Sequence, residues 1–402
     1  MGSAVTNQPD NNTQVEGIPL TENARYGGDN DDDDSGILRY ISIRHGGFSI
    51  SGIPGDEING LTMGGVGRGT VIEHIEVYAN KDDGYEWFGG TVNCKWLVAA
   101  MCGDECFDWD QGYRGKGQFW FGIMPDDEAG KGMEMDGGDD DETGLPYAEP
   151  TVVNLTLIGA GVGNTPGGDQ NELALHFRDN SGGHFYSSVV TDFVADGIVI
   201  EDLTSGQDSR QRLEDGDLTI EHVYWWNFGV TNVLDSIAKQ DFVATYLAGT
   251  GNNFITDPQL GNISRDQSGT LDPRPLPTSP LVSGAMIPAD PFFTQVPYYG
   301  AFAPGVGLWT EGWTALSQDG ITSVREETYS NTVPQSFNLS QNYPNPFNPS
   351  TRITYDVKES GDVTLVVHNI LGQKVAELVN DFKAAGSYLS LIHISEPTRL
   401  QV

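Results

Sequence analysis

The stretches "DDGYEWFGG" (residues 82–90) and "DECFDWDQG" (residues 104–112) decide which folds this chain can adopt, because the second repeats the first 22 positions later. The matched pairs are Asp82 with Asp104, Asp83 with Glu105, Tyr85 with Phe107, Glu86 with Asp108 and Trp87 with Trp109. Short strands that recur every 20–30 residues are typical of a solenoid in which each repeat forms one coil. We therefore expect these residues to lie above one another on neighbouring coils.

The segments around this repeat also have the pattern of strands. "TVIEHIEV" begins at Thr70 and "TVNCKWLV" at Thr91, an offset of 21 residues. Val71, Ile75 and Val77 should share one face of the first strand, and His74 and Glu76 the other. Helical periodicity is almost absent, with a weak candidate at Phe382–Ala385. We predict an all-β fold with a parallel β-helix over roughly residues 36–290 and no substantial helix inside it.

The charge balance excludes several classes of protein. The chain has 21 basic and 57 acidic residues, a formal net charge of −36. Such a surface repels nucleic acid and anionic membranes. No apolar run approaches the roughly 20 residues of a membrane-spanning helix, so membrane insertion is not expected. The acidic surface would attract divalent cations, although solubility in a saline habitat explains it equally well.

Three cysteines, Cys94, Cys102 and Cys106, cannot all pair within one chain. They form no CxxC pattern, which argues against a zinc site, and we expect buried thiols, with a Cys102–Cys106 disulfide as the alternative. Met1 leads into a polar stretch without the pattern of a signal peptide. For a secreted protein this suggests that the native start differs from the one given.

Changes in composition divide the chain into five parts. These are a polar N-terminal segment (1–35), a parallel β-helix (36–317) with a Pro- and aromatic-rich cap from about residue 257, a linker (318–335), a small C-terminal module (336–388) and an off-pattern tail (389–402).

The C-terminal module carries a specific resemblance. "FNLSQNYPNPFNPSTRITYDV", with its core at Tyr343–Pro349, is followed by a Leu-Gly turn within Val367–Gly372. This pattern resembles the C-terminal sorting domain of type IX secretion substrates. The resemblance implies a small Ig-like β-sandwich, an extracellular or outer cell-surface location and the type IX machinery as a partner. The pattern stops after Tyr388, so we expect the module to be incomplete.

The large domain resembles a group of surface proteins found in the Gram-negative bacteria that use type IX secretion. "GLTMGGVGRGTVIEHIEVY", "DDGYEWFGGTVN" and "FDWDQGYRGKGQF" carry the resemblance. It implies a right-handed parallel β-helix at the cell surface and says nothing about chemistry.

Two acidic groups are candidate calcium sites. Asp31, Asp33 and Ser35, followed by Gly36, have the alternating oxygens that open a calcium loop, although the closing Glu is replaced by Ser42. The second group would be stacked by the repeat, with acids about 4.8 Å apart on neighbouring strands. Its members are Asp82, Asp83, Asp104 and Glu105. In both cases the alternative is a solvated acidic turn without an ion.

Glu86 above Asp108 would approach the carboxylate separation of roughly 5–5.5 Å found in retaining glycosidases. Arg114, with Lys116 nearby, could neutralise the pair or serve a polysaccharide lyase. We take Glu86, Asp108 and Arg114 as the candidate catalytic residues. A charged turn without activity is the alternative.

Histidines and tryptophans give weaker signals. His176, Arg178, Asp179 and His184 lie close together in sequence, but isolated surface histidines are usually inert. The aromatic side chains either line a sugar-binding face or, more commonly in a β-helix, fill the interior. They are Trp87, Trp109, Trp120, Trp225 and Trp226.

Three functions remain open. The first is a surface β-helix that binds extracellular polysaccharide or a surface glycan, or mediates adhesion, with calcium. The second is a polysaccharide lyase or hydrolase on the same scaffold, and the third is a structural spacer. One fold hosts many functions, so the fold alone does not decide between them.

Overall fold

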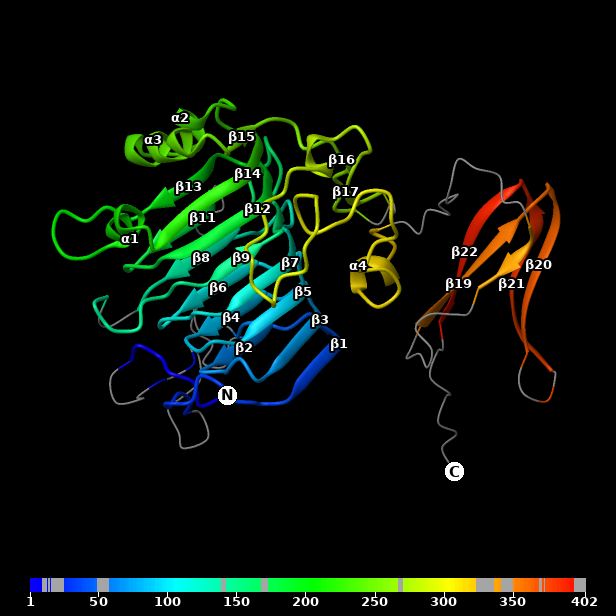
Figure 1. The fold of residues 1–402 in the computed structure, drawn as a ribbon, viewed down its shortest axis with the longest axis horizontal. Helices are drawn as coiled ribbons and strands as arrows, with labels where there is room; N and C mark the ends of the chain where they lie inside the picture. The colour runs from blue at the N-terminus through cyan, green and yellow to red at the C-terminus, as the bar shows by residue number, and fades with distance from the viewer. Residues whose placement is uncertain are drawn as a thin grey trace. The chain divides into compact units, whose positions relative to one another are not determined.

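A computed structural model gives the fold (Figure 1). It describes residues 1–8, 13, 15, 25–48, 58–138, 142–167, 173–266, 270–322, 336–340, 350–368, 371 and 373–393. The chain forms two compact units, one of residues 1–266 and 270–308 and the other of residues 267–269 and 309–402.

The larger unit is built from two parallel sheets between which the chain alternates (Figure 1). Sheet A contains β1 (Ile37–Arg44), β3 (Val71–Tyr78), β5 (Asn93–Ala100), β7 (Lys116–Ile123), β9 (Thr151–Val153), β10 (Thr156–Ile158), β12 (Gly183–Phe193), β14 (Leu218–Phe228) and β15 (Phe254–Ile255). Sheet B contains β2 (Leu61–Gly64), β4 (Tyr85–Phe88), β6 (Phe107–Asp110), β8 (Met133–Asp136), β11 (Leu173–Arg178) and β13 (Asp196–Ile200). Each pass through both sheets is one coil, and the predicted parallel solenoid is confirmed.

The register within sheet B is the one that the repeat predicts. Glu86 pairs with Asp108, and Trp87 pairs with Trp109. In sheet A, however, Val71 pairs with Asn93, so the offset is 22 residues and the expected 21 was wrong. The true register places the buried Ile72 beside the buried Cys94, and burial decides pairing more strongly than a shared Thr-Val dipeptide.

A residue in the left-handed region interrupts nearly every coil of sheet A. These residues are Tyr40, His74, Trp96, Phe119, Asn154, Ser187 and His222, with φ between 52° and 60°. Such a residue turns the chain and shifts the alternation of side chains. Val71 was expected to share a face with Ile75 and Val77, but Ile72 is the residue that joins them in the core, and Val71 is half-buried. The rings of Tyr40 and Trp96 stack on the two sides of His74, at 4.5 and 4.6 Å.

Aromatic side chains fill the space between the sheets. The indole rings of Trp87 and Trp120 lie 4.9 Å apart and are nearly parallel. Trp87, Trp109, Trp120 and Trp225 are fully buried, which confirms core packing for four of the five tryptophans, whereas Trp226 is half-buried. The three cysteines are free and buried, as predicted.

Three α-helices lie within the described part of the span, where no substantial helix was expected. They are α1 (Ser209–Asp215), α2 (Leu234–Ile237) and α3 (Asp241–Thr250). The Asp208 side chain caps the start of α1, and Gly216 ends it in the left-handed conformation. Val243, Ala244 and Leu247 of α3 are buried in the core cluster of the coils. A solenoid needs a cover on its terminal coil, and a short helix can supply it with little periodicity in the sequence.

Both ends of the larger unit pack against the coils. The backbone nitrogens of Gly2 and Ala4 each donate to a turn carbonyl, of Gly64 and Gly65, at 2.8 Å. The Pro-rich region contains β16 (Leu260–Asn262), β17 (Asp272–Pro275) and the 3₁₀ helix η3 (Pro280–Val282). It then lies along the outside of sheet A, where Gly300 N donates to Ser187 O at 2.8 Å.

The smaller unit contains antiparallel strands. Its elements are α4 (Ala315–Gln318), β18 (Asn338–Leu339), β19 (Ser350–Val357), β20 (Gly361–His368), β21 (Lys374–Lys383) and β22 (Gly386–His393). One sheet is β18-β19-β22 and the other is β20-β21. Their apolar residues, including Tyr355, Tyr388 and Val363, pack together. β21 runs to Lys383, so the weak helical candidate beginning at Phe382 was wrong.

Several predictions about this unit stay predictions. The Tyr343–Pro349 core, most of the linker (323–335) and the last residues of the tail (394–402) lie outside the described residues. The sorting role of the unit therefore stays a prediction. Across the described residues, no helix has the length and apolar character needed to cross a membrane.

Candidate functional site

A row of polar side chains crosses the outer face of sheet B. Register pairs Thr62 with Glu86, Glu86 with Asp108, Asp108 with Glu134, and Glu134 with His176. Because the neighbours of these residues along each strand point into the core, the row points outward. Four consecutive coils thus present three carboxyl groups and an imidazole in line. We call these four residues, Glu86, Asp108, Glu134 and His176, the polar row.

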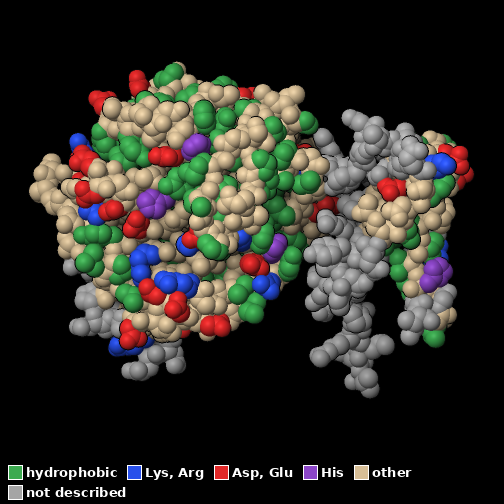
Figure 2. Space-filling model, viewed as in Figure 1, with side chains coloured by type: hydrophobic (Ala, Val, Ile, Leu, Met, Phe, Trp, Pro, Cys, Tyr) green, Lys and Arg blue, Asp and Glu red, His purple; other side chains and the backbone are tan. Residues whose placement is uncertain are grey.

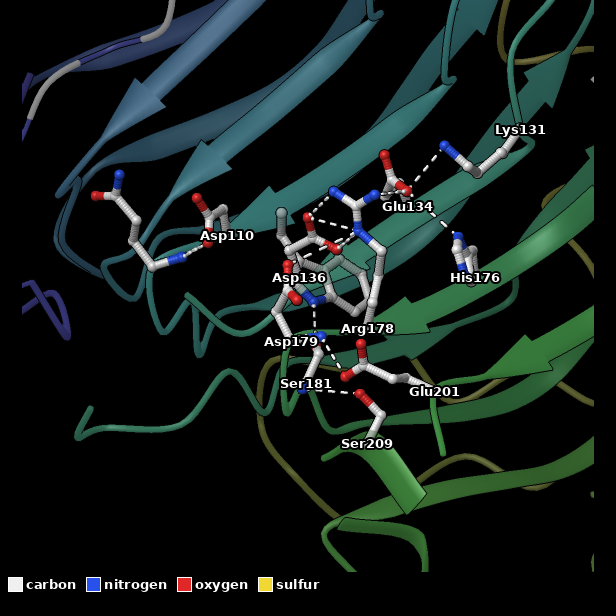
Figure 3. A network of polar contacts seen from close by, with 12 residues as sticks. Asp110, Lys131, Glu134, Asp136, His176, Arg178, Asp179, Ser181, Glu201 and Ser209 are labelled. Atoms are coloured by element: carbon white, nitrogen blue, oxygen red, sulfur yellow. Dashed lines mark hydrogen bonds and ion pairs between the residues drawn. The ribbon is translucent and has the colours of Figure 1, made fainter. Parts of the chain in front are cut away.

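Basic side chains surround the end of the polar row at Glu134 (Figure 3). Lys131 Nζ lies 2.8 Å, Arg178 Nη1 3.1 Å and His176 Nδ1 3.3 Å from Glu134 Oε1. Burial alone would raise the pKa of Glu134, but contacts with His176, Lys131 and Arg178 outweigh it and lower the pKa to about 2. Glu134 is therefore a carboxylate throughout the physiological range.

Asp136 lies beside this cluster and behaves differently. Arg178 holds it through two bonds, Nε to Oδ1 at 2.8 Å and Nη2 to Oδ2 at 2.6 Å. Burial, with the nearby charge of Glu134, nevertheless raises the pKa of Asp136 to about 7. The two carboxyl groups of one strand thus have widely separated pKa values, because Lys131, Arg178 and His176 all contact Glu134, whereas Asp136 is paired with Arg178.

Carboxyl groups lie close together at the other end of the polar row. One oxygen each of Asp83, Glu86 and Asp108 lie within 4.8 Å of one another. Burial and neighbouring carboxylates, first Glu105 for Asp83 and Glu86 for Asp108, raise both pKa values well above the ordinary range. A second set, Asp82, Asp83 and Asp104, has the same spacing. The pKa of Asp104 is raised to about 9 by burial and by Glu105.

Two oxygens beside the first carboxyl set lack partners within the described part of the chain. Asn59 is 7 % exposed, and its Nδ2 donates to Glu86. That bond fixes the orientation of the amide and leaves Asn59 Oδ1 as an acceptor without a partner. Asp108 Oδ1 is likewise buried and unsatisfied. Orphaned acceptors of this kind are costly unless a cation or a proton satisfies them.

The structure divides the predicted metal residues. Asp82, Asp83 and Asp104 come together as expected, whereas Glu105 accepts from Lys131 Nζ at 3.2 Å. That ion pair is almost completely buried, with both side chains 6 % exposed. Glu105 therefore already has a cationic partner and is a weaker candidate ligand than its neighbours.

The N-terminal acidic loop has partners of its own. Arg114 Nη1 lies 3.0 Å from Asp31 Oδ2, and Arg114 Nη2 donates to Val5 O. Burial would raise the pKa of Asp31, but the bonds from Arg114 and Val5 lower it. Asp33 accepts from the Ser3 and Ser35 hydroxyls. These contacts tie the segment to the coils.

Arg114 was expected beside Glu86 and Asp108, and its contacts instead lie with Asp31, Val5 and Gly112. It follows the turn after β6, which carries it past the end of the strand toward the N-terminal segment. The basic residues that do reach the polar row are Lys131 and Arg178. Figure 2 shows basic and acidic side chains intermingled on one face of the larger unit.

Asn59, Lys131, Glu134 and Asp136 were missed by the sequence interpretation. "MEMDGG" at residues 133–138 has the same hydrophobic-acid-hydrophobic-x-x-Gly order as "YEWFGG" and "FDWDQG". A fixed period of 22 does not predict this third copy, because Met133 follows Phe107 by 26 residues. His176 and Arg178 were noticed, but their partners were not. His184 lies in sheet A, with its Nε2 3.0 Å from Glu149 Oε1.

Comparison with known proteins gives one finding. The profile of the family described as "Pectate-lyase like beta helix domain" matches residues 1–269. No curated protein and no solved structure matches the chain.

Proposed function

The chain belongs to the pectate-lyase-like β-helix family, and from that membership we propose that it is an extracellular protein that binds an acidic polysaccharide through a divalent cation. The proposed cation ligands are Asp83, Glu86 and Asp108, with Asn59 Oδ1. The observation that carries the proposal is the convergence of these carboxyl oxygens within 4.8 Å, beside an orphaned amide oxygen.

Electrostatics favours a bound cation. Two carboxylates about 5 Å apart repel by roughly 3 kcal/mol at an effective dielectric constant of 20. Desolvation of Asp83 and Asp108 adds to this cost, as their raised pKa values indicate. A divalent cation bound among the carboxylates replaces their mutual repulsion with attraction to the ion. Oxygen ligands from carboxylates and an amide suit calcium better than zinc.

The neighbouring residues favour an acidic ligand. A cation that keeps open coordination positions can bind a carboxylate of the polysaccharide as well as those of the protein. Arg178, His176 and Lys131 lie further along the same face. Arg178 is the most accessible of the three, with 36 % of its side chain exposed. A guanidinium at that position can pair with a second acidic sugar residue.

We expect calcium to raise the free energy of unfolding by about 2.7 kcal/mol at a hundredfold excess over its dissociation constant. The reason is that the native state gathers the ligands and the unfolded chain does not. Thermal unfolding with calcium and with chelator measures the effect. The double variant Asp83→Asn with Asp108→Asn should lose it, because amides bind calcium more weakly than carboxylates.

The matched control is Asp31→Asn, which alters a carboxylate paired with Arg114. If this variant loses the calcium response and the double variant keeps it, the ion binds at the N-terminal loop. Equal unfolding curves in calcium and in chelator for the unmodified chain would refute the cation proposal.

A second candidate function is glycoside hydrolysis, which the opposed pKa shifts of Asp108 and Glu134 favour. The two residues pair in register on β6 and β8, and neighbouring strands are about 4.8 Å apart. A protonated Asp108 could donate a proton to the leaving oxygen, while the ionised Glu134 acts as nucleophile or base. Carboxyl pairs with separated pKa values commonly divide these roles.

If the chain is a hydrolase, Asp108→Asn should lower the rate at which reducing ends are released from its polysaccharide substrate by about a hundredfold or more, because general acid catalysis contributes that much. Glu149→Gln, in the loop before β9, is the control and should retain activity. Chelator should have little effect on a hydrolase and a large effect on cation-dependent binding. Absence of product from a panel of neutral and acidic polysaccharides would exclude this candidate.

Export by the type IX machinery is part of the same proposal. It rests on the resemblance of residues 336–388 to the sorting domain. The paired antiparallel sheets of the smaller unit are compatible with a β-sandwich.

A further inference from the structure

We propose a second sugar-binding site, for a neutral saccharide, in a cavity on the outside of sheet A. The cavity has a volume of about 390 Å³. It is formed by the C-terminal ends of β12 and β14, by the loop that precedes β16 and by β16 itself. Residues that line it include Trp226, Asn227, Asp192, Asp257 and Asn262. This site is separate from the polar row, which lies on sheet B, and its occupation does not depend on the cation.

The floor of the cavity is held rigidly. Asp192 and Asn227 both adopt left-handed backbone conformations, with φ of 65° and 57°. Asn227 Nδ2 donates to Asp192 Oδ1 at 2.7 Å, and Arg265 Nη2 donates to Asp192 Oδ2 at 2.9 Å. Arg265 Nε also donates to Met124 O, at 2.9 Å. A preorganised floor reduces the entropy that binding would cost.

Trp226 supplies the apolar surface that a sugar ring requires. It pairs in register with Thr191 and follows the fully buried Trp225, so its side chain points away from the core. Of the five tryptophans considered from the sequence, Trp226 is the one that the core does not absorb. An amphipathic indole at the wall of a pocket gives one apolar face and one N–H donor.

Polar groups surround this indole. Asp257 is exposed, and its Oδ1 accepts from Gln259 N, which leaves the other oxygen facing solvent. Asn262 Nδ2 donates to Thr270 O, so its amide oxygen remains an acceptor. Asn227 likewise keeps its amide oxygen after donating to Asp192. An aromatic wall with several fixed hydrogen-bonding groups is the usual composition of a small-molecule pocket.

Charge selects the class of ligand. The Asp192 carboxylate is neutralised by Arg265 at 2.9 Å, whereas Asp257 leaves negative charge at the rim. An anionic sugar or a phosphorylated ligand would be repelled here, in a chain of net charge −36. A neutral saccharide suits this lining, because its hydroxyl groups can donate to Asp257 and Asn262 and its apolar ring face can pack on Trp226. The two sites would then recognise different parts of a mixed polysaccharide.

Isothermal titration calorimetry of the full chain against neutral hexasaccharides of glucose, mannose and xylose tests this proposal, in chelator so that the polar row is silent. At least one should bind, and oligogalacturonate should not. Trp226→Ala should weaken binding by about tenfold or more, the loss expected for one aromatic contact. The control Tyr40→Ala removes a ring that is 57 % exposed elsewhere on sheet A, and it should leave the saccharide affinity unchanged.

Asn262→Ala, at an exposed position, is a second variant that should also weaken binding, and its thermal unfolding curve shows whether loss of the bond to Thr270 O disturbs the fold. Asp108→Asn should leave binding at this cavity intact, which separates a failure here from a failure of the cation proposal. The inference is wrong if no neutral saccharide binds, or if Trp226→Ala and Asn262→Ala both bind as well as the unmodified chain.

Discussion

In buffer with chelator, the free energy of unfolding should fall by several kcal/mol between pH 5 and pH 8. Asp136 has a pKa of about 7 and Asp104 of about 9 in the folded state, and Asp83 and Asp108 are raised as well. In the unfolded chain these groups titrate near 3.8. Above that value the folded state binds more protons than the unfolded state, so stability declines as pH rises.

For Asp136 alone, a shift from 3.8 to about 7 corresponds to about 4 kcal/mol. Below pH 4 the trend should reverse, because Glu134, with a pKa of about 2, loses its stabilising charge as it is protonated. Urea unfolding at a series of pH values measures the profile. Asp83→Asn with Asp108→Asn mimics the protonated groups and should make the profile less steep, with Asp136 and Asp104 accounting for the slope that remains. A profile that is flat from pH 5 to pH 8 in the unmodified chain would contradict the prediction.

Trp87→Ala should lower the free energy of unfolding by about 3–5 kcal/mol, the usual cost of removing a buried aromatic ring. Trp87 is fully buried and stacks on Trp120 at 4.9 Å and on Tyr113 at 5.3 Å. Neighbouring coils share this stack, so the void left by the missing indole would lie between coils. The surrounding residues could fill little of that void. Chemical denaturation monitored by circular dichroism measures the loss.

The control for this variant is Trp226→Ala, the same substitution at a half-buried position on the outer face. It should cost much less, because the ring is already partly hydrated. Similar losses for the two variants would mean that the stack around Trp87 is not the main source of core stability.

The sequence predicts the coils because acids, aromatics and glycines recur together. Glu86 above Asp108 and Trp87 above Trp109 are both found in register. Repetition reports spatial proximity directly, since equivalent residues on adjacent coils must be neighbours. The prediction succeeds where the turns have equal length, as between β4 and β6.

Turn length also explains what the sequence did not predict. Glu134 joins the polar row after a longer turn, and His176 after a much longer one, so no fixed period reveals them. Arg114 is near Asp108 in sequence, but the turn after β6 directs it to Asp31. The left-handed residue His74 shifts the alternation within its strand, so that Ile72 and not Val71 shares the core with Ile75. In each case the local backbone geometry determines where the side chain lies, and the periodicity of the sequence does not predict that geometry.

The row of left-handed residues along sheet A has a consequence for how such chains can diverge. A non-glycine residue in this conformation costs about 1 kcal/mol or more, and the stacked rings of Tyr40, His74, Trp96 and Phe119 help to offset it. Insertion of one residue inside a strand would break both the bend and the stack. Gain or loss of an entire coil would preserve both. Evolution should therefore change the length of these proteins by whole coils, while substitutions accumulate in the turns.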